Sequence, residues 1–219
     1  MVKFFGSALV ASLLFLNSGA AHASLVTDSP LLPPTGPHAK YLSPADVHAT
    51  YNGPGLVIEL ENIIHFGFDN IQHIPSPPND TLESFDSKVH GLASINGGPQ
   101  FPILLTGPVQ VMVFNYSPGD LGNFQTEMLS LDLSGGGVTI RESPTLPSLG
   151  QTGIAGIGGG LYRIDSFFDV FTELSVDGGQ SWIPSQGSTH VELVPEPISL
   201  ALFGLGLAGL GFARRRRTA

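Results

Sequence analysis

The sequence contains no cysteine, which excludes a disulfide framework, a thiolate metal site and a cysteine nucleophile. Basic residues are also scarce, because residues 24–194 hold 17 acidic residues and only four basic ones, a net charge of −13. Such a surface repels nucleic acid and anionic lipid head groups, so we expect neither as a partner. It suits a soluble exterior protein that meets divalent cations or neutral sugars.

Long helical stripes are missing as well. Apolar residues fall in short segments between the abundant Gly (28) and Pro (18), which is typical of an all-β protein. We predict a single two-sheet sandwich over 55–194, immunoglobulin-like or jelly-roll, with a closed barrel as the main alternative. Residues 24–54 are predicted to be an irregular lead-in with room for one edge strand, and residues 143–160 a loop. The expected strands, about eight in number, are 55–61, 63–71, 89–95, 108–116, 124–134, 138–142, 162–176 and 188–194.

The segment 124–134 changes phase in its alternation. Two sets of opposite parity follow one another: Phe124, Thr126 and Met128 share one face, and Leu129, Leu131 and Leu133 share the other. A regular strand sends such sets to opposite faces, so one inserted residue is needed to bring both into one core. We therefore predict a β-bulge near Met128 and Leu129.

Motifs for catalysis and metal binding are missing between the two ends of the chain. No G-x-S-x-G, S-x-x-K, P-loop or H-E-x-x-H pattern occurs there. Six histidines have no partner at the i, i+2 or i, i+4 spacing, although His65 and His73 are able to meet across a sheet; the six are His38, His48, His65, His73, His90 and His190. Asp165, Asp169 and Glu173 share the parity of one strand and are expected to form a solvated face. We predict no metal site, no cofactor and no enzymatic activity.

One turn has a recognisable pattern. Ser175, Asp177, Gly179 and Trp182 fit S-x-D-x-G-x-x-W, which resembles the Asp-box, a hairpin motif of sialidases and other secreted β-proteins. The resemblance implies a structural role, in which the aspartate binds backbone amides of the turn and the tryptophan packs back over the hairpin. A single copy is present, so a glycosidase role is not expected.

The N-terminus has the organisation of a secretory signal peptide. Lys3 precedes an apolar stretch at 4–16, and the small residues Ala21 and Ala23 form an A-x-A cleavage site. The apolar stretch is shorter than the roughly 20 residues that span a bilayer as a helix. We predict a signal helix over 1–23 that is removed after Ala23 by signal peptidase, following export by the general secretion machinery across the inner membrane.

The C-terminus has a second apolar run, which is followed by basic residues. The run 198–213 contains no charge, and Arg214, Arg215, Arg216 and Arg217 follow it directly. A helix of this length covers roughly 24 Å, slightly less than the hydrocarbon core of about 30 Å. Local thinning of the membrane and snorkelling of the arginine side chains close this gap, so we predict a transmembrane span. The positive-inside tendency keeps the arginines in the cytoplasm, so the body faces outward.

The order of parts in this tail is specific. Val194, Pro195, Glu196 and Pro197 come first, then the apolar run, then the arginines. This resembles the PEP-CTERM sorting signal of Gram-negative bacteria, which a membrane-embedded protease-transpeptidase, exosortase, recognises. The resemblance covers 194–219 and implies cleavage near the PEP triplet, transient membrane anchoring and delivery to the cell surface or extracellular matrix. The two prolines keep the backbone there out of helix and strand, and therefore accessible to a protease.

Two functional expectations follow for the body. The first is a secreted, non-enzymatic surface or matrix protein that is associated with exopolysaccharide or a biofilm. The alternative is a carbohydrate-binding or carbohydrate-processing domain delivered by the same route. A binding site would need exposed aromatic rings on a groove or flat face, and an enzyme would need two converging carboxylates in a cleft. The chain has one tryptophan and four tyrosines, so the first expectation is preferred.

Overall fold

The computed structural model describes residues 24–36 and 39–194, and all regular structure within them is β-strand. No helix in this part of the chain is long and apolar enough to cross a membrane. The expected signal helix at 1–23 and the expected membrane helix at 198–213 lie outside the described residues. The strands are β1 (Leu25–Thr27), β2 (Lys40–Leu42), β3 (Ala49–Gly53), β4 (Leu56–Ser76), β5 (Asp80–Ile95), β6 (Phe101–Val113), β7 (Gly122–Gly135), β8 (Val138–Glu142), β9 (Ser148–Gly158), β10 (Leu161–Val170), β11 (Thr172–Ser175), β12 (Ile183–Pro184) and β13 (Thr189–Val194).

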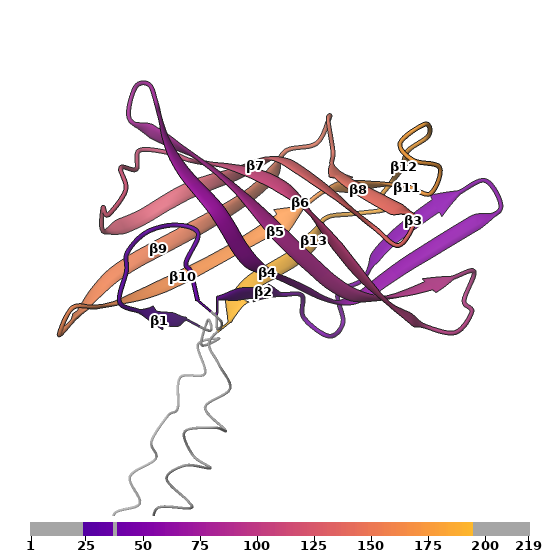
Figure 1. The fold of residues 1–219 in the computed structure, drawn as a ribbon, viewed down its shortest axis with the longest axis horizontal. Coiled ribbons are helices and arrows are strands. Elements are labelled where there is room, and N and C mark those ends of the chain that lie inside the picture. Colours follow the sequence, from indigo (N-terminus) through magenta and orange to yellow (C-terminus); the bar gives the residue numbers. More distant parts are fainter. Residues whose placement is uncertain (1–23, 37–38, 195–219) are drawn as a thin grey trace, which may run out of the picture.

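The strands form a closed antiparallel barrel of eight strands with additional strands at its ends (Figure 1). The order around the barrel is β10, β13, β2, β4, β5, β6, β7 and β9, and β9 pairs with β10 again. β1 pairs with β10 next to β13, whereas β3, β8, β11 and β12 extend the sheet beyond the barrel. The all-β prediction is confirmed. The predicted two-sheet sandwich is replaced by the barrel that the sequence left as the alternative.

The strand that closes the barrel is β9, in a stretch that the sequence predicts to be a loop. Its glycines lower strand propensity, which hid the strand, but one of them is required by close packing. A Cβ at Gly150 would collide with the backbone carbonyl oxygen of Phe167 on β10. Glycine thus lets β9 lie close to its neighbours.

The long strand β4 combines two segments that the sequence separates into two strands. Its pairing with β5 shifts register between Glu61 and Ile64 and again between Phe66 and Asp69. Asn62, with φ of 51°, lies at the first shift. Such bulges increase twist and bend the strand, which a barrel wall requires. The stretch 24–54, expected to be an irregular lead-in, also differs from expectation because β2 is a barrel strand between β13 and β4.

The predicted bulge in β7 is confirmed. Gln110 pairs with Ser130 and Val111 pairs with Met128, so Leu129 has no partner on β6. Met128 is 3% exposed and Leu129 is 42% exposed. Leu129 is therefore the inserted residue and faces outward, while the residues before it (Phe124, Thr126 and Met128) and after it (Leu131 and Leu133) all lie inside the barrel.

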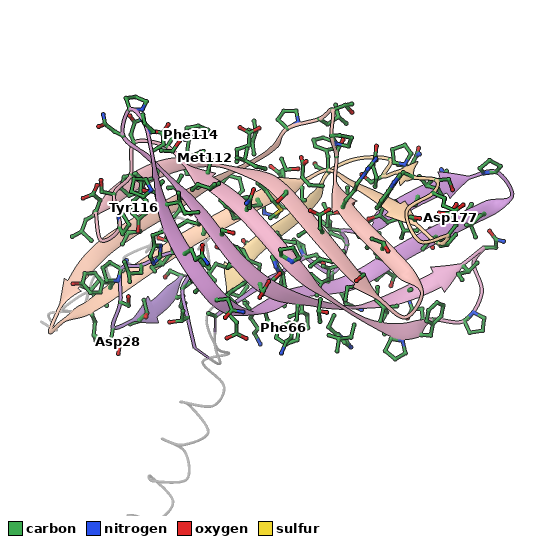
Figure 2. All side chains as sticks on the ribbon, turned by 45° about the horizontal axis from the view of Figure 1, so that its top comes forward. Asp28, Phe66, Met112, Phe114, Tyr116 and Asp177 are labelled. Carbon is green, nitrogen blue, oxygen red and sulfur yellow. The ribbon has the colours of Figure 1, made fainter. Side chains whose placement is uncertain are left out.

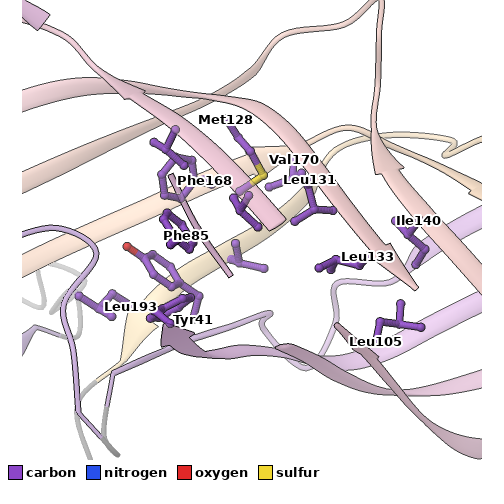
Figure 3. Packing of buried hydrophobic residues seen from close by; sticks show 14 of the residues in the cluster. Tyr41, Phe85, Leu105, Met128, Leu131, Leu133, Ile140, Phe168, Val170 and Leu193 are labelled. Carbon is purple, nitrogen blue, oxygen red and sulfur yellow. The ribbon is translucent and has the colours of Figure 1, made fainter. Parts of the chain in front are cut away.

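The core fills the barrel along its length. Tyr41, Phe85 and Phe168 gather in one part of the interior, and Leu105 and Leu133 lie in the other part, with Met128 between them (Figure 3). The rings of Tyr41 and Phe168 are 5.8 Å apart between centroids and tilted, an arrangement that aromatic pairs favour. The interior is thus mostly packed side chains, with small voids that are described below.

Candidate functional site

The last barrel strand leads directly into the tail. In β13, Val191 and Leu193 are buried in the core, and Val194 is the last described residue. Strand β13 pairs with β10 on one side and with β2 on the other. The tail signal therefore begins where a strand of the barrel wall ends. The other residues predicted to direct sorting and processing lie outside the described residues; they are Ala21, Ala23, Pro195, Glu196, Pro197 and Arg214, Arg215, Arg216 and Arg217.

The Asp-box-like turn connects β11 to β12. Asp177 Oδ1 accepts hydrogen bonds from the backbone N–H groups of Gln180 and Ser181, at 3.0 Å and 2.9 Å. Ser175 Oγ donates to the same carboxylate and accepts from the N–H of Gly179. The Ser181 hydroxyl donates to the carboxylate as well, and this bond contributes most to the effect of the network on acidity. Together the bonds hold the pKa of the Asp177 carboxyl well below its usual range.

The tryptophan of this turn packs against a cation. The guanidinium of Arg141, on β8, lies 4.0 Å from the centre of the Trp182 ring. Arg141 also donates two hydrogen bonds to Glu173 Oε2, from Nε at 2.9 Å and from Nη2 at 2.7 Å. Glu173 was expected to be part of a solvated face, but it is mostly covered by this ion pair. Bonds within the turn use the polar groups of Asp177, which is consistent with a structural turn.

A buried carboxylate lies inside the other end of the barrel, and no sequence pattern indicates it. Glu83, on β5, is 1% exposed, and its Oε2 lies 2.5 Å from His73 Nδ1 on β4. Burial raises the pKa of Glu83 to about 7, and the charge and hydrogen bond of His73 oppose this rise only in part. Burial raises the pKa of Tyr116, and the nearby charge of Glu83 adds to this rise. Tyr116 lies at the opposite end of the molecule from Asp177 (Figure 2).

Three buried polar atoms without a hydrogen-bond partner among the described residues line the same void. They are Glu83 Oε1, His65 Nε2 and Thr126 Oγ1. Desolvation lowers the pKa of His65 to about 4, so this imidazole is neutral at physiological pH. The void has a volume of about 30 Å³, which suits an ordered water bridging such atoms and is far below the several hundred Å³ of a drug-sized ligand site.

A second void lies further along the barrel. It has a volume of about 70 Å³ and an almost entirely apolar wall that includes Leu60, Leu131 and Leu133. His65 and Met128 border both voids. His65 points into the barrel while His73 pairs with Glu83 near the end of the strand, so the structure does not bring the two histidines together.

Two of the remaining histidines each pair with one carboxylate, whereas His90 pairs with none among the described residues and His38 lies outside them. His190 Nδ1 lies 2.8 Å from Asp169 Oδ1, and His48 Nδ1 lies 3.6 Å from Glu61 Oε1. Within the described ranges, no three His, Asp or Glu side chains are close enough to hold a metal ion.

Comparison with known proteins identifies one region of the chain. The model of the PEP-CTERM protein-sorting motif matches residues 193–217, so the resemblance in the tail is confirmed. The match starts inside β13, at Leu193. No curated protein and no solved structure matches the chain significantly. The motif implies a protein that exosortase sorts.

Proposed function

We propose, on the basis of the PEP-CTERM motif, that this chain is an exported, non-enzymatic protein of the cell surface or extracellular matrix. The predicted signal peptide delivers it across the inner membrane, and the predicted helix at 198–213 anchors it until exosortase cleaves near Pro195, Glu196 and Pro197. The barrel is the part that reaches the exterior, where exopolysaccharide is its expected partner.

The single observation that carries the proposal is the motif match at 193–217, which begins in the last two residues of the last barrel strand and continues past its end. The net charge of −13 over 24–194 supports an exterior location, because such a surface stays soluble and away from anionic lipid. The non-enzymatic part is supported by the small size of the void at Glu83, about 30 Å³, which leaves little room for a substrate beside this carboxyl.

Mass spectrometry of the intact protein tests the sorting step. We expect the form from a strain with exosortase to lack residues 198–217, and the form from a matched strain without exosortase to retain them. Glu196→Gln should also retain the tail because it changes the motif itself. Glu192→Gln is the matched control, since it makes the same chemical change just before the matched region.

The outcome that contradicts the proposal is equally direct. If residues 198–217 remain in both strains, exosortase does not process this chain. If they are removed in both strains, another protease is responsible. Fractionation of the same cultures measures location, and the barrel should be found outside the inner membrane only when the tail has been removed.

A further inference from the structure

The outer wall of the barrel has a hollow across four neighbouring strands. It spans β7, β9, β10 and β13, which Figure 1 shows lying beside one another, and has a volume of about 180 Å³. Its wall consists of Asn123, Gln151, Gly153, Asp165, Phe167 and Glu192, with part of Ser166. The inward neighbours of these residues, such as Thr152, Ile154 and Phe168, are buried in the core. The hollow therefore faces the exterior and is separate from the two internal voids.

The hollow exists because residue 153 has no side chain. Gly153 pairs with Asn123 on β7 and with Asp165 on β10. A Cβ at this position would lie 2.8 Å from Asn123 Oδ1 and 4.0 Å from the Asp165 Cβ. The φ of Gly153 is outside the left-handed region, so the backbone does not require glycine there. What the glycine provides is space.

Polar groups around this space are free to bind a ligand. On the same outer face, Asp169 is occupied by His190, at 2.8 Å. Asp165 and Glu192, by contrast, have no hydrogen bond or ion pair with any described residue, and neither have the amides of Asn123 and Gln151. The hollow thus offers two carboxylate acceptors and two amides that both donate and accept.

One aromatic ring completes the wall. Phe167 lies on β10 opposite Glu192 of β13, and its ring lies 5.5 Å from that of His190 at 30° between planes. The imidazole therefore supports the phenyl ring from the side of β13. A supported, partly exposed ring is a flat apolar surface, which is the usual contact for a ligand with one apolar face and polar edges.

The chemistry of the wall selects the class of ligand. Anions are disfavoured by Asp165 and Glu192 and by the negative charge of the body. A divalent cation usually takes six or more oxygen ligands, and the described residues hold no group of three acidic or histidine ligands. A neutral sugar has hydroxyl groups that donate to carboxylates in strong, charge-assisted bonds, and C–H groups that pack on a ring.

We propose that this hollow binds one unit of a neutral polysaccharide. Its volume of about 180 Å³ is below the roughly 300–1,000 Å³ of drug-sized ligand sites, which fits a single sugar ring of a longer chain. The site rests on the proposed function for its ligand, because an exterior location is where the barrel meets such a polymer. It names Asn123, Gln151, Asp165, Phe167 and Glu192 as contacts.

The test uses the full chain, purified in detergent, on an array of neutral gluco-, galacto- and manno-oligosaccharides, followed by calorimetry with the best ligand. Gly153→Val fills the hollow and should weaken binding by roughly tenfold or more. Phe167→Ala, which removes the ring, should weaken binding similarly. The matched control is Gly156→Val on the same strand, where a Cβ meets only Leu121 Cδ1 at an ordinary 3.7 Å, and its affinity should stay within about twofold of the wild type.

Several results overturn this site. One is that wild-type protein with an intact thermal transition binds no neutral glycan. Another is that Gly153→Val binds the glycan as tightly as the wild type. Cationic oligosaccharides are placed on the same array for comparison, and binding of these alone, lost in salt, would assign the hollow to a cationic ligand instead. Release of reducing ends from the bound glycan would make it a catalytic site, with Asp165 and Glu192 as the pair to examine.

The binding assay and the sorting assay fail independently. Binding is measured on purified protein and does not require exosortase, whereas tail removal is measured on protein that has met no glycan. A chain that binds sugar but keeps its tail in both strains refutes the sorting proposal alone. A chain that is processed but binds no neutral glycan refutes the sugar site alone.

Discussion

Replacing the buried carboxyl of Glu83 by an amide should stabilise the protein at alkaline pH. Glu83 is 1% exposed, and burial raises its pKa from the ordinary 4.5 to about 7. The folded protein therefore holds a proton between these two pH values that the unfolded chain has released. Stability from this group is complete below pH 4.5 and is lost as the pH rises through about 7.

The size of the effect follows from the two pKa values. A carboxyl with a pKa of about 7 in the folded state and 4.5 in the unfolded state lowers the free energy of unfolding by about 3 kcal/mol once both forms are ionised. Glutamine has a similar shape and does not ionise, and it keeps the ability to bond His73. We expect Glu83→Gln to exceed the wild type by roughly 1–3 kcal/mol at pH 8.5 and to differ by less than about 1 kcal/mol at pH 5.

Denaturant unfolding of both proteins from pH 5 to pH 8.5 measures the difference. Glu127→Gln on β7 is the matched control, because its carboxylate is only half-buried and faces the outside of the barrel. The difference in stability between this control and the wild type at pH 8.5 should stay well below that of Glu83→Gln. A difference between Glu83→Gln and the wild type that does not change with pH would refute the reasoning, since it would show that Glu83 does not change its protonation in this range.

Two further substitutions test the packing of the barrel. In Gly107→Ala, the new Cβ collides with the carbonyl oxygen of Asp132 on β7. Thermal denaturation should therefore show that the free energy of unfolding falls by about 1–3 kcal/mol or more, whereas Gly156→Ala should leave it nearly unchanged. Tyr51→Phe removes a buried hydroxyl that bonds Thr172 Oγ1 at 2.6 Å, and denaturant unfolding should show a loss of about 1–3 kcal/mol. Equal stability of Tyr51→Phe and wild type would mean that water replaces this bond.

Local features of the fold were predictable from the sequence where they depend on neighbours in the chain. The bulge at Leu129 is predicted by the change of alternation within β7, because side-chain direction in a strand has a period of two. Asp177 and Gly179 likewise belong to one short turn whose bonds connect residues at most four positions apart. Each of these predictions needs no information about distant strands.

Closure of the barrel was not predictable in the same way. It depends on β9, whose Gly150 lowers strand propensity but allows the close approach to Phe167 on β10. It depends also on β2, only three residues long, which receives its pairing from β4 and β13. Short or glycine-rich strands are determined by their partners rather than by their own composition, so the sequence favoured a loop and an irregular lead-in.

The candidate functional sites also differ in whether they depend on neighbours in the sequence or on paired strands. The sorting motif is a continuous sequence signal, so its resemblance to the PEP-CTERM signal was visible in the order of its parts along the chain. Glu83 with His73 and the hollow at Gly153 arise from residues that meet only when strands pair. Asp165, which the sequence places on a solvated face, becomes part of a site only because β9 offers a glycine beside it. Chemistry that is assembled across strands cannot be recognised from the spacing of one strand.

The position of β13 sets a limit on where the tail can be removed. Leu193 is fully buried and Val191 nearly so, and burying such side chains contributes roughly 1.5–3 kcal/mol each. Strand β13 also provides the hydrogen bonds that join β10 to β2. A cut before Val191 would therefore open the barrel wall between these two strands and expose its core. A cut after Val194 leaves every barrel strand intact, so a cleavage that preserves the fold lies at the PEP triplet or beyond it, where the matched motif continues past the end of the strand.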